Sequence, residues 1–180
     1  MASHIAHPLV LGVHPAGRGY RWVLFESPLS PVDWGAASSK GGRNARLIAR
    51  FERLLNRYVP DAVVLEAFED RESRRPERVR LLCRAILHLA GTKGVESFTY
   101  RRSVISTCFG TVGATTRQEI AQAIASHIDV FAHLLPRKRG PGDSADIRQA
   151  HFDAAALAIT HFAVIGGTSP SSSSPGMVQA

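Results

Sequence analysis

The chain has 180 residues, 44% of them hydrophobic, which is enough for one domain with a full-sized core. It carries 22 Lys and Arg against 15 Asp and Glu, so its formal net charge is +7 and its pI is near 10.2. The sequence lacks the roughly 18 consecutive apolar residues of a membrane span, a secretory signal pattern and a paired-cysteine motif. These observations argue against a membrane protein, a disulfide scaffold and a zinc knuckle. We expect a cytoplasmic protein with a polyanionic partner.

The N-terminal region predicts the centre of a sheet. The continuous apolar run Val10–Val13 is typical of a strand that is buried on both faces. Proline and glycine in residues 15–19 predict a tight turn, after which Tyr20–Phe25 returns as a second strand of a hairpin. His14 lies where the first strand ends, and Ser30–Ser38 predicts a third strand.

The middle of the chain alternates helices with short strands. Apolar residues recur at steps of three and four from Leu47 to Tyr58, which predicts an amphipathic helix that Pro60 ends. Residues 61–66 predict an inner strand that finishes at Glu66. A segment of six arginines and three acids at residues 70–84 leads into a helix over 79–90, and residues 95–100 predict another strand.

The C-terminal third predicts two helices. Thr116 and Glu119 have the spacing of a capping box, which marks a helix start. A last helix is expected to begin at residue 143 or 144 and to run to about residue 165. The order of elements predicts an α/β domain over residues 8–165 with helices covering a mixed sheet, between a flexible N-terminus at 1–7 and a disordered Ser/Pro/Gly tail at 166–180.

Two strand ends and one helix face could form an acidic site. His14 and Glu66 lie at strand ends that meet if the strands are neighbours, and Asp146 and Asp153 are seven residues apart on one helix face. Carboxylates gathered in this way are usually held by a divalent cation. Each residue also has a structural alternative: Asp146 caps the helix, Glu66 pairs with an arginine of the basic segment, and Asp153 needs some partner because the helix around it is apolar.

Three blocks of the sequence resemble the RuvC family of Holliday-junction resolvases, in the RNase H-like superfamily. They are VLGVHP at residues 10–15, VVLE at 63–66 and DAAALAITH at 153–161, in the family's order and spacing. The resemblance implies an RNase H-like three-layer fold with a five-stranded mixed sheet, an acidic site that binds two Mg²⁺ ions, a homodimer, and cleavage of branched DNA. In such a site two metal ions activate a water and stabilise the leaving oxygen.

The sequence departs from this pattern at two positions. The family has an aspartate where this chain has His14, and often an acid or histidine where it has Ala150. Asp146 could substitute for the missing acid, whereas His151 should face away from Asp153. Imidazole offers one nitrogen and no negative charge, so we expect weak activity, a preference for Mn²⁺, or no cleavage.

Arginine and lysine residues predict contacts with a DNA backbone. The candidates lie in the basic segment, after the fifth strand, at the capped helix start and in a Pro/Gly loop: Arg74, Arg75, Arg101, Arg102, Arg117, Arg137, Lys138 and Arg139. The alternative for the basic segment is a solvated helix face with local ion pairs. The sequence thus predicts a metal-dependent endonuclease for branched DNA, with Glu66, Asp153, Asp146 and His14 as catalytic and metal-binding residues. The alternative function is a DNA-binding protein that keeps the fold without the chemistry.

Overall fold

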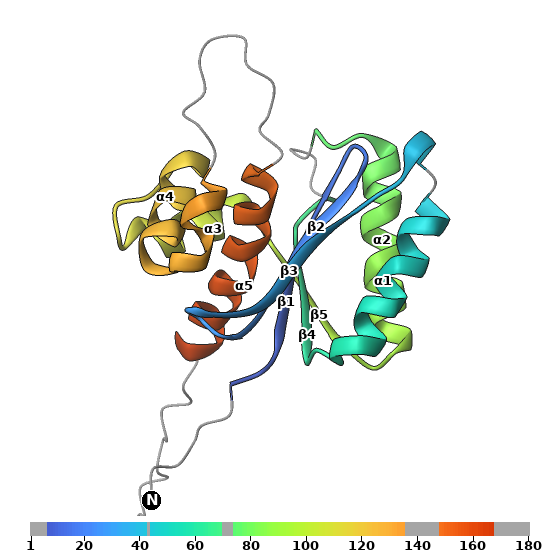
Figure 1. Cartoon of the computed structure of the whole chain (residues 1–180), viewed down its shortest axis with the longest axis horizontal. Helices are drawn as coiled ribbons and strands as arrows, with labels where there is room; N and C mark the ends of the chain where they lie inside the picture. The colour runs from blue at the N-terminus through green and yellow to red at the C-terminus, as the bar shows by residue number, and fades with distance from the viewer. Residues whose placement is uncertain (1–6, 43, 70–73, 136–147, 168–180) are drawn as a thin grey trace, which may run out of the picture.

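A computed structural model describes residues 7–42, 44–69, 74–135 and 148–167. The strands are β1 Val10–Ala16, β2 Gly19–Ser27, β3 Ser30–Ser38, β4 Ala62–Glu66 and β5 Glu96–Tyr100. The helices are α1 Asn44–Tyr58, α2 Glu77–Thr92, α3 Arg102–Gly110, α4 Arg117–His127 and α5 Gln149–Gly167, with 3₁₀ turns at Lys40–Gly42 and Asp129–Leu134. Figure 1 shows their arrangement.

The five strands form one mixed sheet in the order β3-β2-β1-β4-β5. β1, β2 and β3 are joined as antiparallel hairpins, whereas β4 runs parallel to both β1 and β5. Only a two-residue turn separates Ala16 from Gly19, and these two residues pair across the hairpin. The predicted hairpin, third strand and five-stranded mixed sheet are therefore confirmed.

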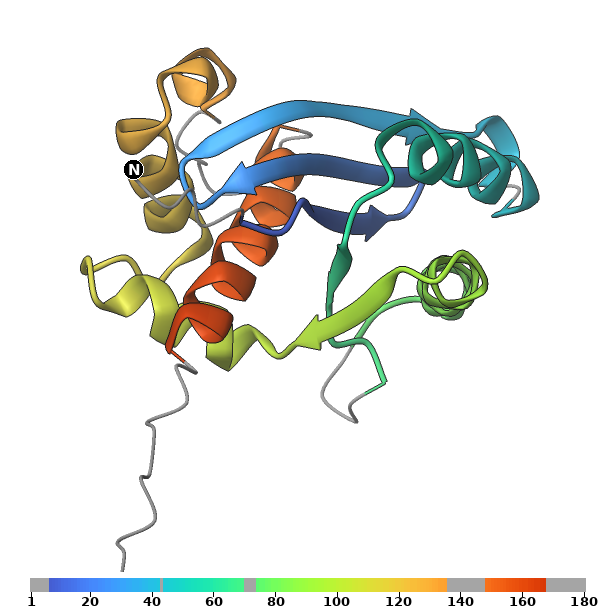
Figure 2. The same cartoon turned by 90° about the horizontal axis from the view of Figure 1, so that it is seen from below.

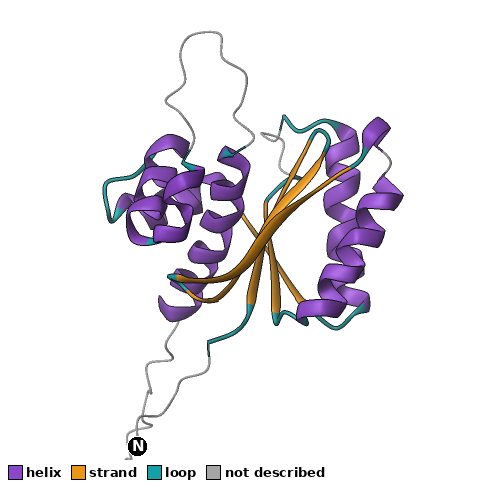
Figure 3. Ribbon diagram, viewed as in Figure 1, coloured by secondary structure: helices purple, strands orange, loops and turns teal. Residues whose placement is uncertain are grey.

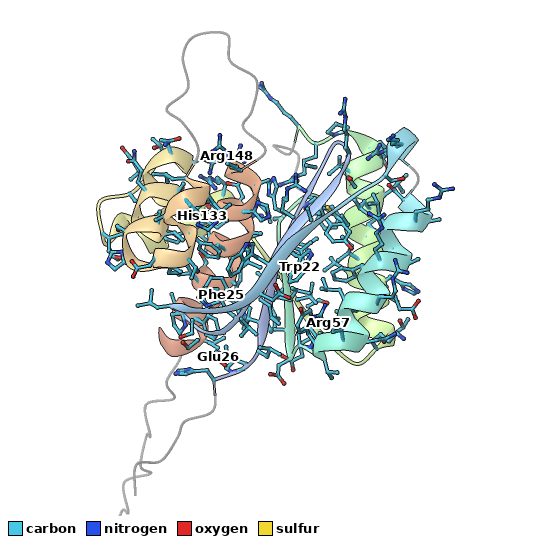
Figure 4. All side chains as sticks on the ribbon, in the orientation of Figure 1. Trp22, Phe25, Glu26, Arg57, His133 and Arg148 are labelled. Atoms are coloured by element: carbon cyan, nitrogen blue, oxygen red, sulfur yellow. The ribbon has the colours of Figure 1, made fainter. Side chains whose placement is uncertain are left out.

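Helices cover both faces of the sheet, as Figure 3 shows. The helices α1 and α2 pack on one face, and α5 packs on the other with α3 and α4 outside it. Neighbouring residues of a strand point to opposite faces of the sheet, so β2 contributes side chains to the hydrophobic core on each face. Trp22 contacts Tyr58 of α1 on one face, and Phe25 contacts Phe131 on the face that α5 covers. Figure 4 shows the two side chains on opposite sides of the sheet. This is the three-layer arrangement that the sequence predicted, with a five-stranded mixed sheet between helices.

The contact between β1 and α5 depends on a glycine. A Cβ atom added at Gly12 would lie 2.0 Å from the carbonyl oxygen of Ala154. Alanines on α5 keep that helix narrow on the side that faces the sheet, with Ala154, Ala155 and Ala158 fully buried. Figure 2 shows α5 crossing the strands. The close approach places the first turns of α5 against the end of β1, where the candidate site lies.

The helix α5 is 19 residues long and apolar enough to meet the length and composition of a membrane span. Ten of its residues are buried, and it packs against β1, β2 and α4. Such burial on a sheet is what a central core helix requires. The apolar character of α5 is therefore explained by the core that it fills.

The prediction and the structure differ at two helices, α3 and α5. We did not predict α3, which follows β5 directly and buries Ile105 and Phe109. Those two residues, four apart, carry the helical spacing, but a single pair in a nine-residue helix is too short a periodic signal. The helix α5 begins at Gln149 and ends at Gly167, two residues later than expected, and the predicted start at residue 143 or 144 lies outside the described residues. Residues 1–6 and 168–180, to which the predictions of a flexible N-terminus and a disordered tail mostly refer, lie outside the described residues.

Candidate nucleic-acid interface

The ends of β1 and β4 bring His14 and Glu66 to the same edge of the sheet. The two strands are parallel, with Val10 beside Ala62 and Gly12 beside Val64. Extending this register by two residues sets His14 beside Glu66, on the face of the sheet that α5 covers. The predicted meeting of the two strand ends is confirmed.

The helix α5 adds Asp153 to this edge. Its Oδ2 atom lies 3.7 Å from Nε2 of His14, and its side chain is only 6% exposed. A carboxylate so deeply buried needs strong partners. The side chain of Arg117 donates to both carboxylate oxygens, with 3.0 Å between Nε and Oδ1 and a closer contact between Nη2 and Oδ2. Asp153 is therefore held in a bidentate ion pair, the strongest geometry that arginine offers a carboxylate.

The start of α4 fixes the position of Arg117. Thr116 is the N-cap: its hydroxyl accepts from the backbone N–H of Glu119, and the Glu119 carboxylate accepts from the N–H of Thr116. These contacts lower the pKa of Glu119 to about 2. The predicted capping box is thus confirmed, and it places Arg117 at the first residue of α4. Gln149, the first residue of α5, donates to the carbonyl oxygen of Arg117 and so connects the starts of α4 and α5.

An arginine also neutralises Glu66. Nη2 of Arg75 lies 3.0 Å from Oε2 of Glu66, and Nη1 donates to the carbonyl oxygen of Pro15 at 2.9 Å. Arg75 therefore links the segment before α2 to the ends of both inner strands. The structural alternative for Glu66, a pairing with an arginine of the basic segment, is confirmed.

A cleft of about 890 Å³ lies at the edge of the sheet toward which β1 and β4 run, and His14, Glu66, Arg75 and Arg117 are among the residues that line it. We call it the strand-end cleft. Its walls come from the β1–β2 turn, the end of β4, the segment before α2, the start of α3 and the start of α4. The charged and imidazole residues that line it are His14, Glu66, Arg74, Arg75, Arg101, Arg102 and Arg117. Five arginines thus surround a centre that holds two carboxylates, Glu66 and Asp153, so the cleft is strongly positive.

His14 is a neutral imidazole in this setting. Burial lowers its pKa to about 4, because the nearby Asp153 raises the value less than desolvation lowers it, and Arg75, Arg117 and Arg102 lower it further. Among the described residues its Nδ1 atom is buried with no hydrogen-bond partner. His14 therefore adds no negative charge to the centre.

The donor set does not fit the predicted pair of Mg²⁺ ions. Mg²⁺ is held by carboxylate and other oxygen ligands, and two ions call for several negative charges. Here one position is imidazole, and guanidinium groups bind both Asp153 oxygens and one Glu66 oxygen. Within the described ranges, no group of three or more His, Cys, Asp or Glu side chains is placed to hold a metal ion. Magnesium and manganese stay predictions.

Only some of the remaining candidate residues that the structure describes lie at the strand-end cleft. Arg101 and Arg102 lie at the cleft, as does Arg74. In contrast, Arg80 and Arg84 form ion pairs with Glu77, and Arg84 also with Glu69, so that part of the basic segment is the solvated helix face of our alternative. His151 lies near Arg21 and the backbone of Gly35, away from Asp153, as expected. The candidates at 137–139 and Asp146 lie outside the described residues.

Comparison with known proteins identifies the fold. No protein-family model and no curated protein matches the sequence. Among solved structures, RuvC from Thermus thermophilus in complex with a Holliday junction substrate is 22% identical with a TM-score of 0.65, covering 90% of this chain and 98% of that one. The yeast mitochondrial Holliday junction resolvase Ydc2 is 11% identical with a TM-score of 0.57, covering 88% and 80% of the two chains. The fowlpox virus resolvase, bound to Holliday junction DNA, is 12% identical with a TM-score of 0.50, covering 86% and 99%. The chain has the same fold as these structures, the RuvC-like fold.

Proposed function

We propose that this protein acts on branched DNA as a RuvC-like junction protein, and that the strand-end cleft binds the DNA backbone. The observation that carries the proposal is the convergence of five arginines from three separate segments on one cleft at the ends of β1 and β4. Guanidinium groups match phosphate geometry, and they bind it without reading base sequence. Solved structures with the same fold include two resolvases bound to Holliday junction DNA, which supports a branched substrate.

A binding comparison tests this function. Fluorescence anisotropy of a labelled four-way junction, with a linear duplex of the same arm sequence as competitor, measures the preference for branched DNA. We expect the junction to bind at least about tenfold more tightly than the duplex, a difference of about 1.4 kcal/mol. Equal affinities would reduce the proposal to non-specific DNA binding, and no binding of either would overturn it.

Strand cleavage is the second candidate function, favoured by one observation. Glu66 and Asp153 occupy the positions at which the resemblance expects catalytic acids, at one edge of the sheet and within reach of the cleft. Arginines bind both Asp153 oxygens and one Glu66 oxygen, so a cation would compete with a guanidinium group at each carboxylate. The test is incubation of an end-labelled junction with Mg²⁺ or Mn²⁺, beside the Glu66→Ala variant. Products that vanish in that variant would establish a nuclease, and an intact, bound junction in both metals would exclude one.

The His14→Asp variant extends this assay. It supplies the carboxylate that the resemblance expects at the end of β1, beside Asp153. If the rest of the site is competent, junction cleavage should rise sharply in this variant. If Arg75 and Arg117 keep the two acids engaged, cleavage stays absent although junction binding persists.

A homodimer is part of this proposal, and it derives from the family resemblance. Two copies would present two strand-end clefts to a branched substrate. Light scattering coupled to size-exclusion chromatography measures the mass directly, and a mass near twice 19.5 kDa is the expected result. A mass equal to one chain in the absence and presence of junction DNA would contradict this part of the proposal.

A further inference from the structure

At the centre of the strand-end cleft, both carboxylates are paired with positively charged arginine side chains. Asp153 is 6% exposed, and both its oxygens accept from Arg117. A metal ion could reach this carboxylate only by displacing a bidentate guanidinium. The second acid, Glu66, is bound by Arg75, and that arginine is anchored by its contact with the carbonyl oxygen of Pro15.

The charges of the cleft side chains also argue against a divalent cation at its centre. Two carboxylates meet two guanidinium groups at the centre, and the imidazole of His14 contributes no negative charge. Among the described residues, Arg74 and Arg102 also line the cleft, so a divalent cation entering it would approach further positive charge. Like charges repel one another, and the repulsion is stronger in a partly buried cleft than in bulk water. The centre therefore repels the cations that an acidic site attracts.

The two arginines that pair with the carboxylates, Arg75 and Arg117, retain N–H groups that can donate to a ligand. A guanidinium has five N–H groups, of which Arg117 uses two on Asp153. The Arg117 side chain is still 49% exposed, so its outer edge faces the cleft. Arg75 is less exposed, at 19%, but it also lines the cleft. Each carboxylate thus orients a guanidinium whose outer edge can donate to a phosphate oxygen.

We propose that Arg75 and Arg117 take the place of divalent cations, so that the cleft binds a DNA phosphate without metal. This inference rests on the proposed function, because the phosphate is that of the branched DNA. In this arrangement Glu66 and Asp153 are positioning residues that hold the two arginines, and they are not ligands of a metal. Added Mg²⁺ then competes for the phosphate and does not assist binding.

Junction affinity with and without metal tests the inference. We expect the wild-type protein to bind a four-way junction in EDTA at least as tightly as in millimolar Mg²⁺ at matched ionic strength. In the double variant Arg75→Ala/Arg117→Ala, the two carboxylates lose their cations, so junction binding should become metal-dependent, with Mg²⁺ or Mn²⁺ raising affinity by about tenfold. The Arg75→Lys/Arg117→Lys variant keeps both charges and should remain metal-independent. Arg53→Ala, which removes one charge on the exposed face of α1, should behave as wild type.

A second measurement separates this inference from the proposed function. Electron paramagnetic resonance counts free Mn²⁺ in a solution of the protein without DNA. The inference expects no stoichiometric binding to the wild-type chain and stoichiometric binding to the double alanine variant, with circular dichroism confirming that both are folded. Stoichiometric Mn²⁺ binding by the wild type, or a tenfold gain in its junction affinity on adding Mg²⁺, would overturn the inference. Failure to bind any DNA would overturn the proposed function, while the manganese titration still decides the inference.

Discussion

At the scale of single residues, the central feature is the pairing of Asp153 and of Glu66 with one arginine each. Sequence patterns indicated that Asp153 faces inward and needs a partner, because the surrounding helix is apolar. They also indicated Arg117 as a helix-start residue suited to a phosphate. They could not indicate that the two residues meet, since the residues are 36 positions apart in the sequence and no periodic pattern links them. The contact exists only because α4 packs beside α5.

Removing Arg117 should destabilise the fold. Asp153 is almost fully buried, so the Arg117→Ala variant leaves its charge unpaired, and we expect the free energy of unfolding to fall by about 2 kcal/mol. Urea denaturation measures this loss. Adding Asp153→Asn to the variant should recover part of it, because the unpaired charge is then gone. Additive losses in the double variant would contradict the pairing.

At the scale of elements, the site depends on how closely α5 approaches β1. The sequence predicted both elements and the outcome that residues 14, 66 and 153 share one edge. It did not reveal that Gly12 is the reason, because a glycine in a buried strand has several explanations. The missed helix α3 has a similar cause: its two buried residues give too short a periodic signal between β5 and a loop.

The Gly12→Ala variant tests this packing. An added methyl group would collide with the backbone at Ala154, so β1 and α5 must separate, and we expect a loss of about 1–3 kcal/mol in stability. Gly17→Ala is the matched control. A Cβ there meets nothing within 4 Å, so its stability should change by no more than about 0.5 kcal/mol. Equal thermal melting points for Gly12→Ala and wild type would contradict the close approach.

The capping box of α4 gives a pH-dependent prediction. Hydrogen bonds from Thr116 and Thr115 lower the pKa of Glu119 from 4.5 to about 2. Because the folded-state pKa is the lower one, the stabilisation is complete above pH 4.5 and disappears as the pH falls toward 2. The stability difference between wild type and Glu119→Gln should therefore shrink over that window in urea titrations. A difference that is constant from neutral pH to pH 2 would contradict the cap.

The cap itself can be removed at neutral pH. Thr116→Ala loses the hydroxyl that accepts from the backbone of Glu119, so we expect a loss of about 1 kcal/mol in stability. Thr116→Ser keeps the hydroxyl and should lose much less. Because α4 begins at Arg117, junction affinity should also fall in the alanine variant. Identical melting of the alanine and serine variants would show that the cap contributes nothing.

At the scale of the whole molecule, composition predicted a polyanionic partner and block order predicted the RuvC-like fold. Neither the composition nor the order of the blocks could show where the charged side chains lie in the structure. The basic segment is a single run in sequence, but in the structure Arg74 and Arg75 reach the cleft, whereas Arg80 and Arg84 pair with acids on the solvent side of α2. The cleft arises from segments brought together by the parallel pairing of β1 and β4. Its net positive charge, and the poor fit to magnesium, follow from that assembly.

The salt dependence of junction binding tests most directly whether DNA phosphates enter the strand-end cleft. The logarithm of the binding constant falls linearly with the logarithm of salt concentration, with a slope of about −0.9 for each phosphate contacted. Arg74→Ala/Arg102→Ala removes two cleft charges that hold neither Glu66 nor Asp153 in an ion pair, so the slope should become shallower by about two, while Arg53→Ala leaves it unchanged. An unchanged slope in the cleft variant, or an equal change in the Arg53 control, would contradict DNA binding at this site.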